Sequence, residues 1–234
     1  MAPLLHTVEQ TIKMTAILPH ITLETGKQPS HCIIWLHGLG ADGNDFAPIV
    51  DQLNLPVATR FVFPHAPQRP VTINGGYVMR AWYDIAGQTI DAKQDEPGIR
   101  ASQQAVEKLI AQQVAGGIPA SNIVLAGFSQ GGAIALHTAL RQIAPLAGVL
   151  ALSTYLPLSD SAGSEARPAS RITPVFMAHG ISDPVVPYTL GSASLNKVRS
   201  LGYAVEWHEY PMQHSVCDAE LRDIEQWLRT RLSS

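Results

Sequence analysis

Short apolar runs that alternate with segments of helical periodicity constrain this chain more than any other feature of its sequence. A strand that is buried on both faces of a sheet must be apolar nearly throughout, which is typical of parallel sheets covered by helices. The alternation therefore predicts an α/β fold with a mostly parallel central sheet and helices on both faces. We expect its strands at residues 32–36, 60–63, 123–128, 148–152, 174–179 and 203–209.

Apolar residues at helical spacing predict the helices that cover this sheet. Positions i, i+3, i+4 and i+7 lie on one face of a helix, so a stripe of this kind packs against a core. A third helix is expected directly after His214, because Ser215 and Asp218 form a capping pattern before further spaced apolar residues. The apolar stripes that predict the first two helices consist of Phe46, Ile49, Val50 and Leu53, and of Val106, Leu109, Ile110 and Val114.

Two segments interrupt the alternation. Residues 64–77 are rich in Pro and Gly, and residues 157–171 are rich in Ser and Ala. The alternation resumes after each of them, so we interpret both as long surface loops of one sheet rather than as linkers. With 46% hydrophobic residues in 234, the chain can bury a large core, and a single domain over residues 1–234 is expected.

Charge and cysteine content exclude several classes of function. Lys and Arg number 16 against 19 Asp and Glu, and the net charge of −3 with no run of like charges argues against nucleic-acid binding. Cys32 and Cys217 lack metal or redox spacing and are expected to be free buried thiols. No stretch is long and apolar enough for a membrane helix, and residues 1–20 do not resemble a signal peptide. The expected location is cytoplasmic, with no stable membrane insertion.

A glycine motif at residues 38–43 has the pattern G-x-G-x-x-G after a predicted strand. That pattern is typical of dinucleotide binding, which also requires an acidic residue at the end of the next strand to hold a ribose. The sequence has no Asp or Glu between Asp51 and Asp84. Nicotinamide or flavin binding is therefore disfavoured.

A second glycine motif, Gly127-Phe128-Ser129-Gln130-Gly131, follows a predicted strand and precedes a helix expected at residues 133–140. Strand, sharp turn and helix make a nucleophile elbow, in which the serine has a positive φ and flanking glycines avoid collisions. An exposed hydroxyl becomes a nucleophile only when a base accepts its proton and an acid orients that base. The motif therefore predicts Ser129 as a nucleophile.

The base and the acid follow from chain order, which is serine, then acid, then histidine in folds built around such an elbow. His214 lies on a loop after a predicted strand and is preferred to His208, which lies within that strand, and to His137 and His179. Asp183 follows the preceding strand and is preferred as the acid. The rival carboxylates are Asp160, Glu165 and Asp218, the last being better explained as a helix cap.

The oxyanion that forms when a serine attacks a carbonyl needs hydrogen-bond donors. The backbone N–H of Gln130, directly after the nucleophile at a helix start, is one candidate. We expect the loop 37–40 to supply the other through the N–H of Leu39, and His37 to orient that loop. On this interpretation, the glycines of residues 38–43 allow backbone N–H groups to approach a substrate oxygen rather than a pyrophosphate.

With these residues in place, the chain from about residue 30 onward resembles the carboxylesterase, acyl-protein thioesterase and lysophospholipase family of α/β-hydrolases, and its bacterial carboxylesterase members most of all. The resemblance implies an α/β-hydrolase fold without a large lid domain, the site residues Ser129, Asp183, His214, Leu39 and Gln130, no cofactor and no metal, and acyl esters or thioesters as substrates. Residues 1–29 and 157–171 match no family motif. The blocks that carry the resemblance are residues 37–40, 64–67, 81–84, 127–132, 179–180 with 183–187, and 210–212 with 214–216.

Trp82 and Leu156 adjoin the predicted site in sequence and are expected to line an apolar acyl groove. A small hydrolase with few added segments should have a shallow, open site, so short- to medium-chain esters are the expected substrates. Two alternatives remain open: a serine peptidase on the same fold and a binding protein without catalytic activity. The chain is expected to be a monomer or a homodimer.

Overall fold

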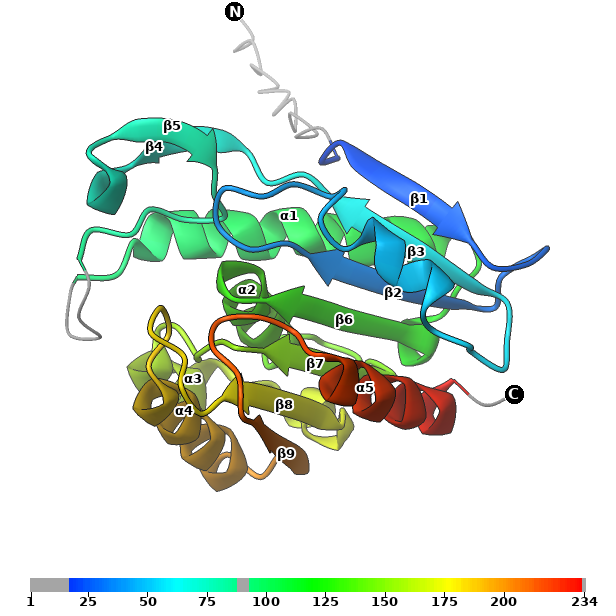
Figure 1. Cartoon of the computed structure of the whole chain (residues 1–234). Helices are drawn as coiled ribbons and strands as arrows, with labels where there is room; N and C mark the ends of the chain where they lie inside the picture. Colours follow the sequence, from blue (N-terminus) through cyan, green and yellow to red (C-terminus); the bar gives the residue numbers. More distant parts are fainter. Residues whose placement is uncertain (1–16, 88–92, 233–234) are drawn as a thin grey trace, which may run out of the picture.

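A seven-stranded sheet forms the centre of the molecule (Figure 1). The computed structural model describes residues 17–87 and 93–232, so that the interpretation of residues 1–20 falls almost wholly outside the described part. The spatial order of the strands is β1-β3-β2-β6-β7-β8-β9, and every neighbouring pair is parallel except β1 with β3. The strands are β1 (His20–Glu24), β2 (His31–Leu36), β3 (Thr59–Pro64), β6 (Ile123–Phe128), β7 (Gly148–Leu152), β8 (Val175–Gly180) and β9 (Val205–Tyr210).

Alternate residues of the central strands enter two apolar cores, one on each face of the sheet. On β2, Ile34 packs with one cluster of buried residues and Ile33 with the other. The first core is completed by α1 (Glu96–Ala115), α2 (Gln130–Ala139) and α4 (Tyr188–Ser200), and the second by η1 (Ala47–Asp51) and α5 (Asp218–Arg231). Helices on both faces confirm the predicted architecture, and apolar strands are what such double coverage requires.

All six predicted strands are present, with ends that differ by at most two residues from the expected ones. The strand of this central sheet that sequence reasoning missed is β1, which pairs antiparallel with β3 at the edge of the sheet from His20↔Pro64 to Glu24↔Arg60. Its side chains are half-buried or exposed. An edge strand buries little side-chain surface and so lacks the apolar run by which the central strands were found.

The helix predicted from the stripe at residues 46–53 is wrong in length. The structure has only the short 3₁₀ helix η1 there. Pro48 lies in the first turn of η1, and Pro56 follows three residues after Leu53, so a longer helix has little room before the second proline. Ile49 and Leu53 are nevertheless buried. In α1 the second stripe is confirmed except at Val114, which is 44% exposed near the end of the helix.

Residues 64–77 are not the long loop that we expected. They contain β4 (Gln68–Val71) and the short 3₁₀ helix η2 (Thr72–Asn74), and β4 pairs antiparallel with β5 (Tyr77–Arg80) in a separate two-stranded sheet. The two glycines of the connecting turn, Gly75 and Gly76, have φ values of +65° and +79°, a region that favours glycine. Gly75, Gly76 and Pro70, which contributed to the loop prediction, are thus turn and strand residues of a hairpin.

Residues 157–171 are likewise more ordered than expected. They form the helix α3 (Ser159–Glu165) and begin the 3₁₀ helix η4 (Pro168–Ile172). Their Ser, Ala and Gly content gives no amphipathic signal, and the helix is held by tertiary contacts: Ala162 is fully buried, and the Glu165 carboxylate pairs with Arg100 and Arg141. Short helices of this kind depend on packing rather than on propensity.

The last helix begins three residues later than its capping pattern predicts. Helix α5 starts at Asp218, with Cys217 as the N-cap residue and no side-chain cap hydrogen bond. Ser215 belongs instead to the preceding turn, where its N–H donates to the Gln213 carbonyl. Asp218 is therefore the first helical residue, where its negative charge is favoured by the helix dipole. Among the described residues, no helix is both long and apolar enough to cross a bilayer.

Candidate active site

Ser129 lies in the sharp turn between β6 and α2, at the carboxyl edge of the sheet. Its backbone has φ 55° and ψ −122°, a strained conformation for a residue with a side chain. Three hydrogen bonds hold it: its N–H donates to the Leu152 carbonyl (2.9 Å), and its own carbonyl accepts from the Ala133 N–H (3.0 Å) and the Thr154 hydroxyl (2.6 Å). The surrounding chain thus stabilises a turn that Ser129 would not adopt alone.

The two glycines that flank Ser129 are required by close backbone contacts, as the motif predicted. A Cβ atom on Gly127 would lie 2.4 Å from the Gly131 carbonyl group, and one on Gly131 would lie 2.3 Å from the Leu36 carbonyl oxygen. Neither neighbour can move away, because both are backbone atoms. Any side chain at these positions would therefore displace the turn.

Ser129, His214 and Asp183 form one continuous series of hydrogen bonds. His214 Nε2 lies 2.9 Å from Ser129 Oγ, and His214 Nδ1 lies 2.6 Å from Asp183 Oδ2. The tautomer that satisfies both contacts donates its Nδ1–H to the carboxylate and accepts the Ser129 hydroxyl proton at Nε2. An imidazole in this position can accept the hydroxyl proton when the oxygen attacks a carbonyl.

The turns that carry Asp183 and His214 are tied to each other through their backbones. The N–H groups of Ile181 and Ser182 donate to the carbonyls of Tyr210 and Met212. Gly180 permits this approach, since a Cβ atom there would lie 2.5 Å from the Met212 carbonyl oxygen. The distance between acid and imidazole is therefore set by main-chain contacts at the ends of β8 and β9.

Asp183 is held in place by backbone N–H groups as well as by His214. Its side chain has no exposed surface, and its Oδ1 accepts from the N–H groups of Val185 (2.8 Å) and Val186 (2.9 Å). The first of these is the side-chain-to-backbone bond of an Asx turn. The Asp183 carboxylate thus bonds the backbone of its own turn and the His214 ring.

The other candidate histidines lie apart from the Ser129 hydroxyl. His208 is on β9, where its ring bonds Glu206 and lies 3.5 Å from Asp223. His137 lies in α2 and contacts Gln103. His179 ends β8, just before the turn that carries Asp183, and its Nε2 lies 3.7 Å from Asp183 Oδ2 and donates to the Val186 carbonyl.

The rival carboxylates also have other partners. Glu165 pairs with two arginines on the α1 and α2 side of the sheet, and Asp160 lies in the first turn of α3. Asp218 begins α5. Of the acidic residues weighed from the sequence, Asp183 is thus the one that the fold brings to His214.

The two expected oxyanion donors lie on backbone segments beside Ser129. Gln130 begins α2, so its N–H is among the first-turn amides that have no partner within a helix. Gly38, directly before Leu39, lies next to the serine: a Cβ atom on Gly38 would lie 3.6 Å from Ser129 Cβ. His37 orients this loop as expected, because its ring bonds the Gly38 carbonyl (2.7 Å) and the Ala66 N–H (3.0 Å).

Trp82 and Leu156 do not line an open groove in this structure. Trp82 has no exposed surface and Leu156 is 3% exposed, so both are core residues. The Trp82 indole N–H donates to the His37 carbonyl at 2.9 Å, a contact that holds the ring inside the protein. Adjacency in sequence predicted their nearness to the site but not the direction in which their side chains point.

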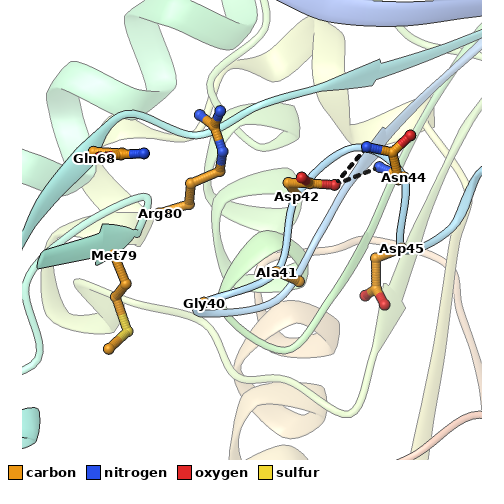
Figure 2. A pocket seen from close by; sticks show the side chains of 8 residues that line it. All are labelled: Gly40, Ala41, Asp42, Asn44, Asp45, Gln68, Met79 and Arg80. Atoms are coloured by element: carbon orange, nitrogen blue, oxygen red, sulfur yellow. Dashed lines mark hydrogen bonds between the residues drawn. The ribbon is translucent and has the colours of Figure 1, made fainter.

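An open hollow of about 540 Å³ adjoins the candidate oxyanion loop, residues 37–40 (Figure 2). One wall is the loop that continues from Leu39, and the other is the hairpin of β4 and β5. The loop is fastened to the hairpin where the Gly40 N–H donates to the Arg80 carbonyl (2.9 Å). The hollow is lined by Gly40, Ala41, Asp42, Asn44, Asp45, Gln68, Met79 and Arg80.

The cysteines and the acidic groups give no sign of metal chemistry in the described part of the chain. Cys32 is buried and Cys217 half-buried, and both are free. Burial raises the pKa of the Cys32 thiol to about 12, which makes it unreactive. Within residues 17–87 and 93–232, no three His, Cys, Asp or Glu side chains are grouped as metal ligands would be.

Comparison with known proteins decides the family. The model of the phospholipase/carboxylesterase family matches residues 19–232. The chain belongs to this family. It is an ester hydrolase with an α/β-hydrolase fold, and the described residues include no large lid domain.

Similar members of the family are fungal and plant proteins. The acyl-protein thioesterase 1 of Neurospora crassa is 42% identical over 86% of each chain, and that of Mycosarcoma maydis is 40% identical over 89% of this chain and 94% of the relative. The crystal structure of Arabidopsis thaliana SOBER1 has a TM-score of 0.82 at 33% identity, covering 87% of this chain and 99% of that one. Zea mays acyl-protein thioesterase 2 has a TM-score of 0.79 at 29% identity over 91% and 99%.

These relatives correct one detail of the sequence-based resemblance. The family was identified correctly, but the particular likeness to bacterial carboxylesterases is wrong. The blocks that carried the resemblance include Ser129, Asp183 and His214, and a nucleophile, base and acid serve ester and thioester hydrolysis alike. Their side chains therefore do not distinguish between branches of the family.

Proposed function

We propose that Ser129 is the nucleophile of an acyl ester and thioester hydrolase, with His214 as its base and Asp183 as the acid that orients His214. One observation carries the proposal: the unbroken series of hydrogen bonds from the Ser129 hydroxyl through the imidazole to a carboxylate with no exposed surface. Such a series allows a neutral hydroxyl to lose its proton as the carbon–oxygen bond forms.

The reaction then has two halves. Ser129 Oγ attacks the acyl carbonyl while its proton passes to His214 Nε2, and the oxyanion is stabilised by the N–H groups of Leu39 and Gln130. His214 returns the proton to the departing alkoxide or thiolate, which leaves an acyl-enzyme. A water molecule, deprotonated by His214, then attacks the acyl carbonyl. The bond to Ser129 Oγ breaks, His214 returns the proton to that oxygen, and the carboxylic acid is released.

The proposed substrates are short- to medium-chain acyl esters and the corresponding thioesters. The site opens at the carboxyl edge of the sheet, and the relatives named acyl-protein thioesterase favour a thioester as one leaving-group class. The hollow beside the oxyanion loop is the space proposed for the leaving group. A peptidase is disfavoured by family membership. A cytoplasmic location and a monomeric or homodimeric state stay predictions from the sequence.

A labelling experiment tests the nucleophile. A fluorophosphonate probe should attach to Ser129 in the parent protein and should not label Ser129→Ala, which removes the reacting oxygen. Hydrolysis of p-nitrophenyl butyrate by Ser129→Ala should fall by a factor of about 10⁴ to 10⁶, as for other triad enzymes. Persistent labelling of the alanine variant would refute the assignment.

A matched pair of histidine variants tests the base. His214→Ala should lose nearly all turnover, whereas His208→Ala, which removes a ring from the same strand-and-turn segment, should keep it. A larger loss for His208→Ala would reverse the assignment. Asp183→Asn should fold normally and lose activity by a factor of about 10⁴, because the amide favours the wrong imidazole tautomer.

A panel of substrates then distinguishes the acyl and leaving-group classes. It consists of p-nitrophenyl esters of increasing chain length, an acyl thioester, a lysophospholipid and a peptide. We expect the highest kcat/KM for the short and medium esters and the thioester, and no cleavage of the peptide. If the peptide were the only substrate cleaved, the protein would be a peptidase and the proposed esterase activity would be refuted.

A further inference from the structure

We propose that the side chain of Gln130 is a positioning residue for the oxyanion hole, acting through Trp82 on the loop that carries Leu39. The inference rests on the proposed function, in which the backbone N–H groups of Gln130 and Leu39 stabilise the oxyanion. It assigns a separate role to the Gln130 side chain, which no sequence motif predicted.

The Gln130 amide bonds two successive backbone groups of the segment after β5. Its Oε1 accepts from the Trp82 N–H and its Nε2 donates to the Tyr83 carbonyl, each at 2.8 Å. Gln130 is 2% exposed, so this amide is turned into the protein and away from any substrate. Few side chains can both accept and donate over this length, and an ionised glutamate only accepts.

Trp82 connects the Gln130 amide to the oxyanion loop. Its indole N–H donates to the His37 carbonyl at 2.9 Å, and its ring lies 5.4 Å from the His37 ring. The Ser102 hydroxyl donates to the Trp82 carbonyl from helix α1. The peptide that precedes Gly38 is therefore held by a tryptophan whose own backbone is held by Gln130.

His37 completes the connection on the loop side. Its Nδ1–H donates to the Gly38 carbonyl, and its Nε2 accepts from the Ala66 N–H, so the ring must be neutral. Burial, the largest effect, lowers the pKa of His37 and favours this neutral form. From Gln130 to Gly38, each successive contact is buried, and such a series transmits a small displacement instead of absorbing it.

These contacts hold the two proposed oxyanion donors in position relative to each other. One donor is the main-chain N–H of Gln130, and the other lies two residues after the carbonyl that Trp82 holds. Oxyanion stabilisation depends on donors about 2.7–3.1 Å from the developing charge. Loss of the Gln130 amide should therefore weaken binding of the transition state more than binding of the substrate.

The test compares Gln130→Met with a matched control. Methionine has similar length but leaves the Trp82 N–H and the Tyr83 carbonyl without their partner. For a p-nitrophenyl ester, kcat should fall by about 10- to 100-fold with little change in KM, less than the loss of a donor itself. Affinity for an acyl trifluoromethyl ketone, whose adduct with Ser129 bears an oxyanion, should fall by the same factor.

The control is Gln113→Met in helix α1. Gln113 is also a buried glutamine, 5% exposed, and its amide oxygen accepts from Arg60 at the opposite end of the sheet. This variant should be less stable but should keep the parent's kcat and ketone affinity. Equal losses in both variants would show that destabilisation alone lowers activity, and the proposal would fail.

A second variant gives a signature that a merely structural role would not produce. In Gln130→Glu, a protonated carboxyl can accept from Trp82 and donate to Tyr83 as the amide does, whereas the ionised form cannot donate. The ratio of variant to parent kcat/KM should therefore rise as the pH is lowered. Taking the ratio at each pH cancels every titration that variant and parent share, and the titratable groups near the Gln130 amide are His37 and the bonded hydroxyls of Tyr83 and Tyr155.

Different results would refute the proposed function and the role of the Gln130 side chain. If the parent neither hydrolyses esters nor binds the ketone, the proposed function fails. If the parent is active, Ser129→Ala is inactive and Gln130→Met retains full kcat and ketone affinity, then only the role of the Gln130 side chain is refuted. A Gln130→Glu ratio that does not change with pH would also refute it.

Discussion

Glu220 brings a carboxyl group into the interior beside the turn that carries His214. The residue lies in the first turn of α5 and has no exposed surface. Burial raises its pKa to about 8, an effect that the backbone N–H of Cys217 opposes and the charge of Asp223 reinforces. Tyr210, which bonds Asp223, also faces this group. Near neutral pH, Glu220 is thus mostly protonated in the folded protein.

Glu220→Gln should stabilise the protein increasingly as the pH rises. In the parent, the folded state keeps a proton that the unfolded state loses above its ordinary pKa of 4.5, so stability falls between pH 4.5 and about 8. The slope for one proton is at most about 1.4 kcal/mol per pH unit. Melting temperatures at pH 5 and pH 8 should show a difference between variant and parent that grows with pH.

A control for this titration lies on the same helix. Glu225 is partly exposed and pairs with Arg229, and Glu225→Gln should shift the melting temperature by only a small amount. A difference between Glu220→Gln and the parent that does not change with pH would contradict a buried, protonated carboxyl.

Residue identity and spacing selected catalytic candidates that the fold brings together, but they did not predict the buried environments around them. Chain order and loop position selected Ser129, Asp183 and His214, and the fold brings these three within hydrogen-bond distance. The inward direction of Trp82 and the second contact of Asp183 with His179 were missed. Both depend on which side chains from distant segments fill the space, and spacing along one segment does not encode that.

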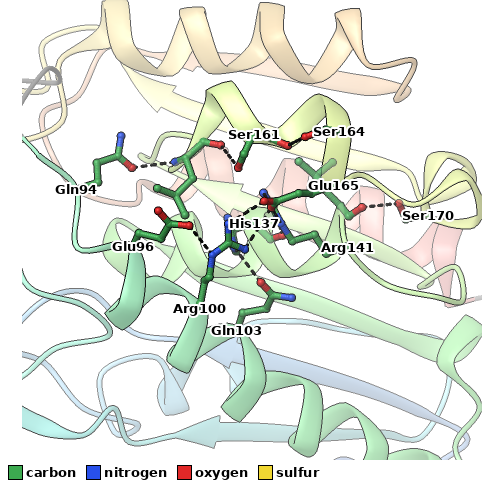
Figure 3. A network of polar contacts seen from close by, with 12 residues as sticks. Gln94, Glu96, Arg100, Gln103, His137, Arg141, Ser161, Ser164, Glu165 and Ser170 are labelled. Carbon is green, nitrogen blue, oxygen red and sulfur yellow. Dashed lines mark hydrogen bonds and ion pairs between the residues drawn. The ribbon is translucent and has the colours of Figure 1, made fainter.

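At the scale of elements, a cluster of ion pairs joins three helices on one face of the sheet (Figure 3). The Glu165 carboxylate of α3 pairs with Arg100 of α1 at 2.7 Å and with Arg141, directly after α2, at 2.6 Å. The Arg141 side chain is 5% exposed and also donates to the His137 carbonyl. The two guanidinium groups, that of Arg100 first, lower the pKa of Glu165 to about 2.

Glu165→Gln should destabilise the protein by about 1–3 kcal/mol at pH 7, because it leaves the buried Arg141 without its carboxylate. Solvent screening of the half-buried Glu165 keeps the effect below that of a fully buried pair. Since the folded pKa lies below the ordinary value of 4.5, this contribution is present above pH 4.5 and is lost as the pH falls toward 2. Urea unfolding at pH 7 and pH 3 measures it.

Glu96→Gln is the matched control for this cluster. Glu96 pairs with the same Arg100 at 2.7 Å, but its side chain is 54% exposed. The change should therefore cost no more than about 0.5 kcal/mol. A Glu165→Gln variant as stable as Glu96→Gln at pH 7 would show that the cluster does not hold α3 in place.

For the molecule as a whole, one sheet separates two apolar cores that share its strands. Val124 faces one core and its neighbour Leu125 the other, so the loss of a central strand would open both. Helix α5, which contributes Trp227 and Leu228 to one face, follows directly after the turn that bears His214. Core packing and site geometry are therefore coupled through the same strands.

This coupling supports the sequence-based prediction of a single domain. Calorimetric unfolding at a pH that permits refolding should give one transition whose calorimetric enthalpy equals its van't Hoff enthalpy. Activity toward a p-nitrophenyl ester should be lost in the same temperature range. Two separated transitions would indicate that the faces of the sheet unfold independently and would contradict a single domain.

The sequence by itself determined the parallel strands, the elbow at Ser129 and the family, because apolar periodicity and glycine spacing reflect the local demands of burial and backbone conformation. Only the tertiary structure decided that residues 20–24 extend the sheet, that residues 159–165 form a helix and that Trp82 points inward. Those features draw their stability from contacts between segments far apart in the chain. Such contacts leave no periodic pattern in the segment itself.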